Sequence, residues 1–147
     1  MSRRRFGAAC AALAAALALP AAAAPEDVIP KVKPSVVMVG TLLRTRNPQF
    51  LFRGTGFAVG DGSLVATNSH ILTAPIDAGA GETFVIGIPG TEGRAELRPA
   101  KLVREDPARD LALLRFEGAA LPALALAGRE AREGETLLFT GFPIGSI

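Results

Sequence analysis

Apolar and polar positions along this chain form short runs separated by turn residues, and no run shows a convincing amphipathic helical spacing. Six runs rich in aliphatic and β-branched residues precede Gly118, with Gly, Pro, Asn or Asp in the stretches that separate them. They cover residues 35–39, 57–59, 64–66, 83–88, 95–105 and 111–116. This pattern predicts an all-β fold in which the six runs form an antiparallel barrel.

The second and third of these runs are joined by Gly60-Asp61-Gly62, a strong turn signal that predicts a β-hairpin. His70, the single histidine of the chain, comes just after this hairpin and has small neighbours. An imidazole there could face a cleft and act as a base. A histidine taken alone is more often a surface or hydrogen-bonded core residue, so spacing and a partner must support the catalytic interpretation.

The stretch from Gly54 to His70 supplies that spacing. Gly54-Thr-Gly-Phe, a Gly-Asp-Gly turn and Thr67-Asn-Ser-His resemble, without a gap, the histidine segment of trypsin-like serine proteases of the bacterial HtrA (Deg) type. The typical family form is Gly-Ser-Gly-Phe, a strand pair and Thr-Asn-x-His-Val. The resemblance implies the first barrel of a trypsin-like fold, a six-stranded Greek key, and hydrolysis of peptide bonds with His70 as general base and acid.

The same resemblance implies a carboxylate partner for the histidine. Asp110 directly precedes Leu-Ala-Leu-Leu and matches the family's Asp-Leu-Ala-Leu-Leu segment. In that role it would accept the Nδ1–H of His70 and fix the imidazole tautomer. Two alternatives remain open from the residues: Asp110 merely begins a strand, or the partner is Asp106, which precedes Pro107 and is more typical of a turn.

The nucleophile of such an enzyme is absent from the sequence. The family's Gly-(Asp/Asn)-Ser-Gly-Gly motif does not occur, and Ser69, which adjoins His70, would point to the opposite side in an extended chain. In this family the oxyanion donors and the specificity pocket also belong to a second barrel. We therefore expect no catalysis from the 147 residues alone. The serines are Ser2, Ser35, Ser63, Ser69 and Ser146.

The predicted organisation has four parts. Residues 1–23 are expected to be a signal peptide, 24–34 a lead-in segment, 35–127 the first barrel and 128–147 the start of a truncated second barrel. Within the last part, residues 134–145 are predicted to form a seventh strand. That stretch resembles the family segment Gly-Glu-x-Val followed by Gly-x-Pro-x-Gly, which opens the second barrel.

The first 23 residues combine arginines 3–5, an apolar run and alanines that offer a cleavage site, which predicts export to the periplasm or beyond. Both a twin-arginine and an ordinary secretory route fit. An uncleaved membrane anchor is the less favoured alternative, because most of the apolar run is alanine. Cys10 lies in this segment, so the mature chain would contain no cysteine.

Charge narrows the choice of partners. The net charge is +2, but without three signal arginines the 13 remaining Lys and Arg face 14 Asp and Glu. The remaining cations are dispersed, which argues against nucleic acid. No phosphate loop, metal-ligand cluster or coenzyme fingerprint is present, so we expect no cofactor and no metal. The expected partner is a protein or peptide substrate.

Two other classes of function stay open at this point. The chain could be an exported pseudoprotease that binds peptides or a protein partner, or a structural half-domain that associates with a separate second barrel. Both His70 and Asp110 are present, and a binding module has no chemical need for either. We therefore favour an incomplete enzyme.

Overall fold

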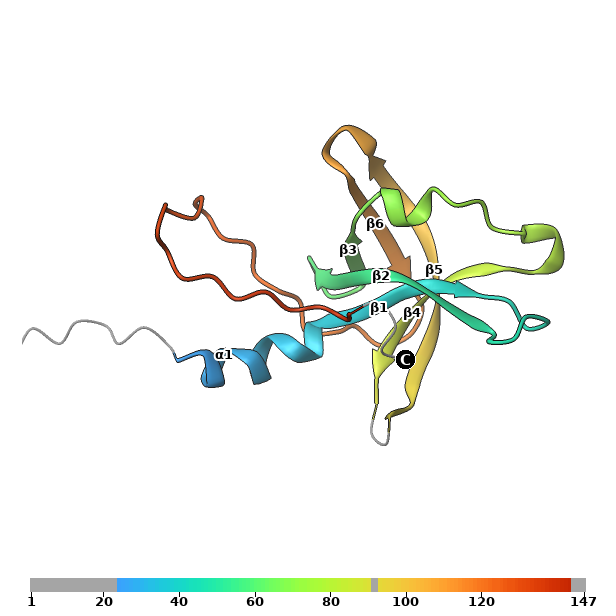
Figure 1. Ribbon diagram of the computed structural model, residues 1–147, viewed down its shortest axis with the longest axis horizontal. Coiled ribbons are helices and arrows are strands. Elements are labelled where there is room, and N and C mark those ends of the chain that lie inside the picture. Colours follow the sequence, from blue (N-terminus) through green and yellow to red (C-terminus); the bar gives the residue numbers. More distant parts are fainter. Residues whose placement is uncertain (1–23, 91–92, 144–147) are drawn as a thin grey trace, which may run out of the picture.

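The computed structural model describes residues 24–90 and 93–143. The predicted signal peptide, including Ser2 and Cys10, and the terminal Ser146 lie outside the described residues. One helix, α1, and six strands follow each other along the chain (Figure 1). Their bounds are α1 Pro25–Val32, β1 Val36–Leu42, β2 Phe50–Val59, β3 Leu64–Thr67, β4 Thr83–Pro89, β5 Ala95–Asp106 and β6 Leu111–Phe116.

The six strands close into a barrel in the order β1-β2-β3-β6-β5-β4, and every neighbouring pair is antiparallel. β4, β5 and β6 follow one another directly, and β3 lies beside β6 rather than β4, which is a Greek-key connection. The predicted all-β, six-stranded antiparallel barrel is confirmed. β2 is longer than predicted, because it begins at Phe50 and pairs with the far end of β1 at Leu42.

The core lies inside the barrel and is built from aliphatic side chains of different strands. Val37 and Val39 on β1, Val65 on β3, Ile86 on β4 and Leu114 on β6 are fully buried. Along β6 the exposed and buried positions alternate, as expected for a strand with one face on a core. Each such side chain contributes about 1.5–3 kcal/mol through burial, so the barrel is the stable body of the molecule.

The sequence pattern predicts no convincing amphipathic helix, and the structure differs from this prediction at residues 25–32. Helix α1 forms there, followed by a short 3₁₀ turn at Lys33–Ser35. The residues at its two ends favour helix formation. Pro25 is in the first turn, Glu26 and Asp27 follow it, and Lys31 is in the last turn. This charge order favours the helix dipole, and a first-turn proline needs no hydrogen-bond partner for its nitrogen.

The chain after β6 first runs along the outside of the barrel. The backbone N–H of Leu121 donates to the Gly62 carbonyl and that of Leu124 donates to the Ala58 carbonyl, both at 2.9 Å. These bonds tie the segment to the β2–β3 hairpin. The chain then extends away as a long loop before it returns towards the barrel (Figure 1).

The strand predicted over residues 134–145 does not form in its described part, which ends at Pro143. A strand needs a neighbour that accepts and donates along its length, and no described strand pairs with this segment. One contact with the barrel is the backbone N–H of Phe142, which donates to Thr55 Oγ1 at 2.9 Å. It also lines a cavity with α1 through Leu138 and Phe139. A domain boundary after residue 127 remains a prediction.

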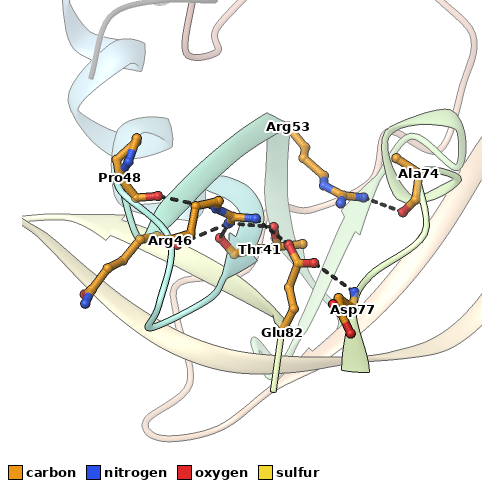
Figure 2. Close-up of polar contacts among 8 residues, drawn as sticks. Thr41, Arg46, Pro48, Arg53, Ala74, Asp77 and Glu82 are labelled. Atoms are coloured by element: carbon orange, nitrogen blue, oxygen red, sulfur yellow. Dashed lines mark hydrogen bonds and ion pairs between the residues drawn. The ribbon is translucent and has the colours of Figure 1, made fainter. Parts of the chain in front are cut away.

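A partly buried ion pair holds the loops together at one end of the barrel (Figure 2). Arg46 donates to Glu82 Oε1 at 2.7 Å and to the Thr41 carbonyl at 3.1 Å, and Glu82 Oε2 accepts the backbone N–H of Asp77 at 2.9 Å. Arg53 donates to the Ala74 carbonyl at 2.7 Å. These bonds anchor the loop between residues 73 and 82 at both ends.

No helix within residues 24–90 and 93–143 is long and apolar enough to cross a membrane.

Candidate active site

The backbone of His70 is held in position by contacts of the residues that precede and follow it in the sequence. Before it, at the end of β3, the Thr67 hydroxyl donates to the Thr55 carbonyl at 2.8 Å. After it, the 3₁₀ turn His70–Leu72 ends in Leu72, which is buried in the core. The imidazole itself stays 68% exposed. The barrel thus fixes the backbone of His70 and leaves its ring open to solvent.

Asp110 is placed by the turn between β5 and β6. A 3₁₀ turn, Pro107–Arg109, precedes it, and its own backbone is left-handed with φ 54° and ψ 45°. Aspartate adopts this conformation more readily than most residues, since its short side chain can form local hydrogen bonds. The turn directs the Asp110 carboxylate away from its own strand and towards the end of β3.

The strand pairing explains why residues so far apart in sequence meet. β3 and β6 are antiparallel neighbours, and Thr67 at the end of β3 pairs with Ala112 at the start of β6. His70 follows the one strand and Asp110 precedes the other, so both emerge at the same end of the barrel. The Greek-key order of the strands therefore builds the candidate site.

Both carboxylate oxygens of Asp110 contact His70. Oδ2 lies 2.8 Å from the imidazole Nδ1, and Oδ1 accepts the His70 backbone N–H at 2.8 Å. The His70 backbone N–H, followed by the imidazole, lowers the pKa of Asp110. An ionised carboxylate at this position requires Nδ1 to carry the proton, which leaves Nε2 as the basic nitrogen. The arrangement is that of an oriented imidazole base.

The rival carboxylate, Asp106, is engaged elsewhere. Its Oδ1 accepts the backbone N–H of Arg109 at 3.2 Å and its Oδ2 accepts the Arg109 guanidinium at 2.7 Å. It caps the 3₁₀ turn. The structure thus brings His70 together with Asp110 and not with Asp106.

The serines in the described residues are held away from the imidazole. Ser35 is buried, Ser63 donates to Asp61 Oδ1 at 2.6 Å, and Ser69 donates to Glu105 Oε1 at 2.5 Å. The argument that Ser69 lies in extended chain is wrong, because its φ of −64° and ψ of −42° are helical. Its hydroxyl nevertheless bonds to Glu105 instead of His70.

Sequence reasoning missed Asn68. Its side-chain amide donates to Asp110 Oδ2 at 3.0 Å and to the Asp110 carbonyl at 3.3 Å. The signal was present, because asparagine is one of the fixed positions in the Thr-Asn-x-His pattern. Its role could be recognised only from the structure, because Asn68 and Asp110 are 42 positions apart in the sequence.

Within residues 24–90 and 93–143, no group of three or more His, Cys, Asp or Glu side chains could hold a metal ion.

Fold and site together define a class: an antiparallel barrel that presents a histidine–aspartate pair at one end, as in serine-type hydrolases. The family model for the trypsin-like peptidase domain matches residues 54–146. The chain therefore belongs to the trypsin-like peptidase domain family, and its curated relatives are of the DegP type.

Several of these relatives carry the name probable periplasmic serine endoprotease DegP-like. The protein from Pseudomonas putida (strain GB-1) is 39% identical over 103 residues, which cover 69% of this chain and 19% of that protein. The protein from Hahella chejuensis (strain KCTC 2396) is 37% identical over 108 residues, which cover 72% of this chain and 21% of that protein. The chain thus spans about a fifth of the length of these relatives.

A solved structure, the apo protease domain of MamO from Magnetospirillum magneticum, is also similar. It is 26% identical, with a TM-score of 0.45, and the match covers 62% of this chain and 42% of that one.

Proposed function

We propose that this chain supplies the base and its orienting carboxylate for serine-type hydrolysis of peptide bonds. His70 is the general base and acid, and Asp110 fixes its tautomer. The observation that carries the proposal is the double contact of the Asp110 carboxylate, 2.8 Å to the ring and 2.8 Å to the backbone of a solvent-exposed His70. Membership of the trypsin-like family supports it.

The chemistry follows from this arrangement. The serine hydroxyl gives its proton to Nε2 of His70 as its oxygen attacks the substrate carbonyl. The imidazolium is stabilised by the ionised Asp110, and His70 then passes the proton to the leaving amine. The Ser63 and Ser69 hydroxyls bond to other residues and Ser35 is buried, so in this proposal the nucleophile comes from outside the described residues. The substrate is a protein or peptide.

The proposal is tested by completing the site. The 147-residue chain alone should neither hydrolyse an unfolded protein nor react with a fluorophosphonate probe, since labelling needs an activated serine. We define the joined protein as a fusion in which this chain replaces the matched residues of the Pseudomonas putida serine endoprotease. The part of that relative that follows the match, which is to supply the serine, is kept.

The joined protein should hydrolyse the substrate and take the label, and His70→Ala should abolish hydrolysis. A folded joined protein whose rate is unchanged by His70→Ala would overturn the proposal. Reaction of any serine of the 147-residue chain alone with the probe would show that the chain holds its own nucleophile. Binding of unfolded protein without hydrolysis by the joined protein would favour the pseudoprotease alternative.

We further propose that the chain is exported to the periplasm and loses about its first 23 residues. The arginine-led apolar N-terminus and the word periplasmic in the names of the relatives support this. Intact-mass measurement of the periplasmic fraction should show the shortened chain. Recovery of the full-length chain in the membrane fraction would instead show that the N-terminal segment is an anchor.

A further inference from the structure

We propose that Asn68 is a positioning residue that holds Asp110 in the orientation needed to select the imidazole tautomer of His70. This inference rests on the function proposed above. Asn68 is exposed, yet its Nδ2 makes two bonds to one residue, at 3.0 Å to Asp110 Oδ2 and at 3.3 Å to the Asp110 carbonyl. Both partners are acceptors, so only the NH₂ end of the amide can face them.

Asn68 belongs to a row of three consecutive residues, each of which bonds to the end of β5 or to Asp110 after the β5–β6 turn. Asn68 bonds to Asp110, the Ser69 hydroxyl donates to Glu105, and His70 contacts Asp110 through both its backbone and its ring. Ser69 is buried and fixes the segment in place. Asn68 is thus the member of the row, besides His70 itself, that binds the Asp110 carboxylate.

The need for such a residue follows from the conformation of Asp110. Its left-handed backbone costs on the order of 1 kcal/mol for a residue with a side chain, and the side chain is 44% exposed, so water competes for its oxygens. The Asn68 amide donates hydrogen bonds to both the backbone carbonyl and the carboxylate of Asp110. It therefore restrains the backbone and the side-chain rotation at the same time.

Oδ2 shares its two lone pairs between Asn68 and the imidazole. With Asn68 in place, the Oδ2 lone pair that faces Nδ1 stays directed at the ring, and the Nδ1–H tautomer is favoured. Without it, the His70 backbone N–H still holds Oδ1, but Oδ2 loses one of its two partners and turns more readily towards water, so the Nε2–H tautomer gains. That tautomer cannot accept a proton at the nitrogen that faces solvent.

The test uses the 147-residue chain, in which His70 gives the only histidine signals. Long-range ¹H–¹⁵N correlation spectra at about pH 8, where an ordinary imidazole is neutral, report the tautomer directly. The wild type should be mainly Nδ1–H. Asn68→Ala and the isosteric Asn68→Asp, which lacks the donor, should both be mainly Nε2–H. The matched control is Asn47→Ala, which changes an exposed asparagine in another loop and should leave the tautomer unchanged.

Amide hydrogen exchange provides a second readout. The His70 backbone N–H, which donates to Asp110, should exchange about tenfold faster in Asn68→Ala, whereas the Leu114 amide in β6 should keep its rate. Both Asn68 variants should keep the melting temperature, because the side chain is exposed. Global unfolding of both would assign Asn68 a structural role and overturn the proposal.

The outcomes separate the two proposals. If the wild type is Nδ1–H and both Asn68 variants remain so, Asn68 does not position Asp110, and the His70–Asp110 pair stands. If the wild type is already Nε2–H, the pair itself fails, and with it the proposed function.

Discussion

Two aspartates of the same turn, Asp106 and Asp110, have different tasks because the backbone directs them differently. Asp106 precedes the 3₁₀ turn and accepts bonds from Arg109 within it. Asp110 follows the turn in a left-handed conformation, and its carboxylate reaches His70. A single residue's backbone angle therefore decides which carboxylate meets the imidazole.

Glu82 shows how a buried charge can stabilise a loop. It is 6% exposed, and its pKa falls to about 2 because the Thr41 side chain, the Asp77 backbone N–H and the Arg46 guanidinium all stabilise the ionised form. In the unfolded chain the carboxyl group titrates near its ordinary pKa of 4.5. Between these two values the unfolded state binds the proton and the folded state does not, so acid favours unfolding.

The stability contributed by Glu82 should thus be fully present above the ordinary pKa and should be lost as the pH falls from about 4.5 to about 2. Urea denaturation at a series of pH values measures this. Glu82→Gln should lower the free energy of unfolding at neutral pH by about 1–3 kcal/mol and flatten its decline in acid. Glu133→Gln, at an exposed glutamate, is the control. Equal acid slopes for Glu82→Gln and the wild type would show that the network does not hold the charge.

At the residue scale, the sequence could offer His70 and Asp110 as candidates because a linear motif surrounds each of them, while Asp106 stayed open as the partner of the histidine. It could not identify Asn68, Glu105 or Glu82 as partners. Their contacts join residues more than 30 positions apart, and only the closed barrel brings such residues together. The choice between Asp106 and Asp110 also depended on a backbone conformation that no composition or spacing reveals.

The β2–β3 hairpin is the element on which the histidine segment depends, and its turn carries two left-handed glycines. Gly60 has φ 65° and open space where a side chain would begin. Gly62 has φ 84°, and a Cβ there would clash with the Leu121 carbonyl. The Leu121 N–H also donates to the Gly62 carbonyl at 2.9 Å, so the hairpin and the segment after β6 are packed against each other.

Replacing each of these two glycines with alanine should therefore lower the stability of the protein by unequal amounts. Gly60→Ala should cost about 1 kcal/mol, from the left-handed backbone alone. Gly62→Ala should cost about 1–3 kcal/mol more, since the Leu121 segment must move as well. Thermal denaturation of the two variants provides the comparison. Equal losses of stability in the two variants would mean that the segment after β6 does not pack against the hairpin in solution.

At the element scale, strands were predictable wherever turn residues bounded a β-branched run, as in β4, and where Gly-Asp-Gly joined two runs. Helix α1 was not, because it is short and contains Pro30. The strand expected over residues 134–145 has the composition of a strand but lacks a partner among the described strands. Composition alone does not supply the neighbour that a strand needs.

At the scale of the whole molecule, the six strands form a closed barrel, and the candidate site lies at one end of it. The six strands bury a continuous core and place the exposed imidazole at one end. The segment after β6 leaves apolar side chains in solvent, and Phe139 is 94% exposed. The matched residues cover about a fifth of the length of the DegP-like relatives.

The most direct test of the central claim, that Asp110 orients His70 as the base, compares two carboxylate variants of the joined protein. Asp110→Asn should keep the fold and lower kcat by a factor on the order of 10⁴, because the amide favours the wrong imidazole tautomer. Asp106→Asn removes an ion pair with Arg109 that does not touch His70, and should lower kcat far less. If Asp106→Asn instead costs more than Asp110→Asn, with both variants folded, the claim is contradicted.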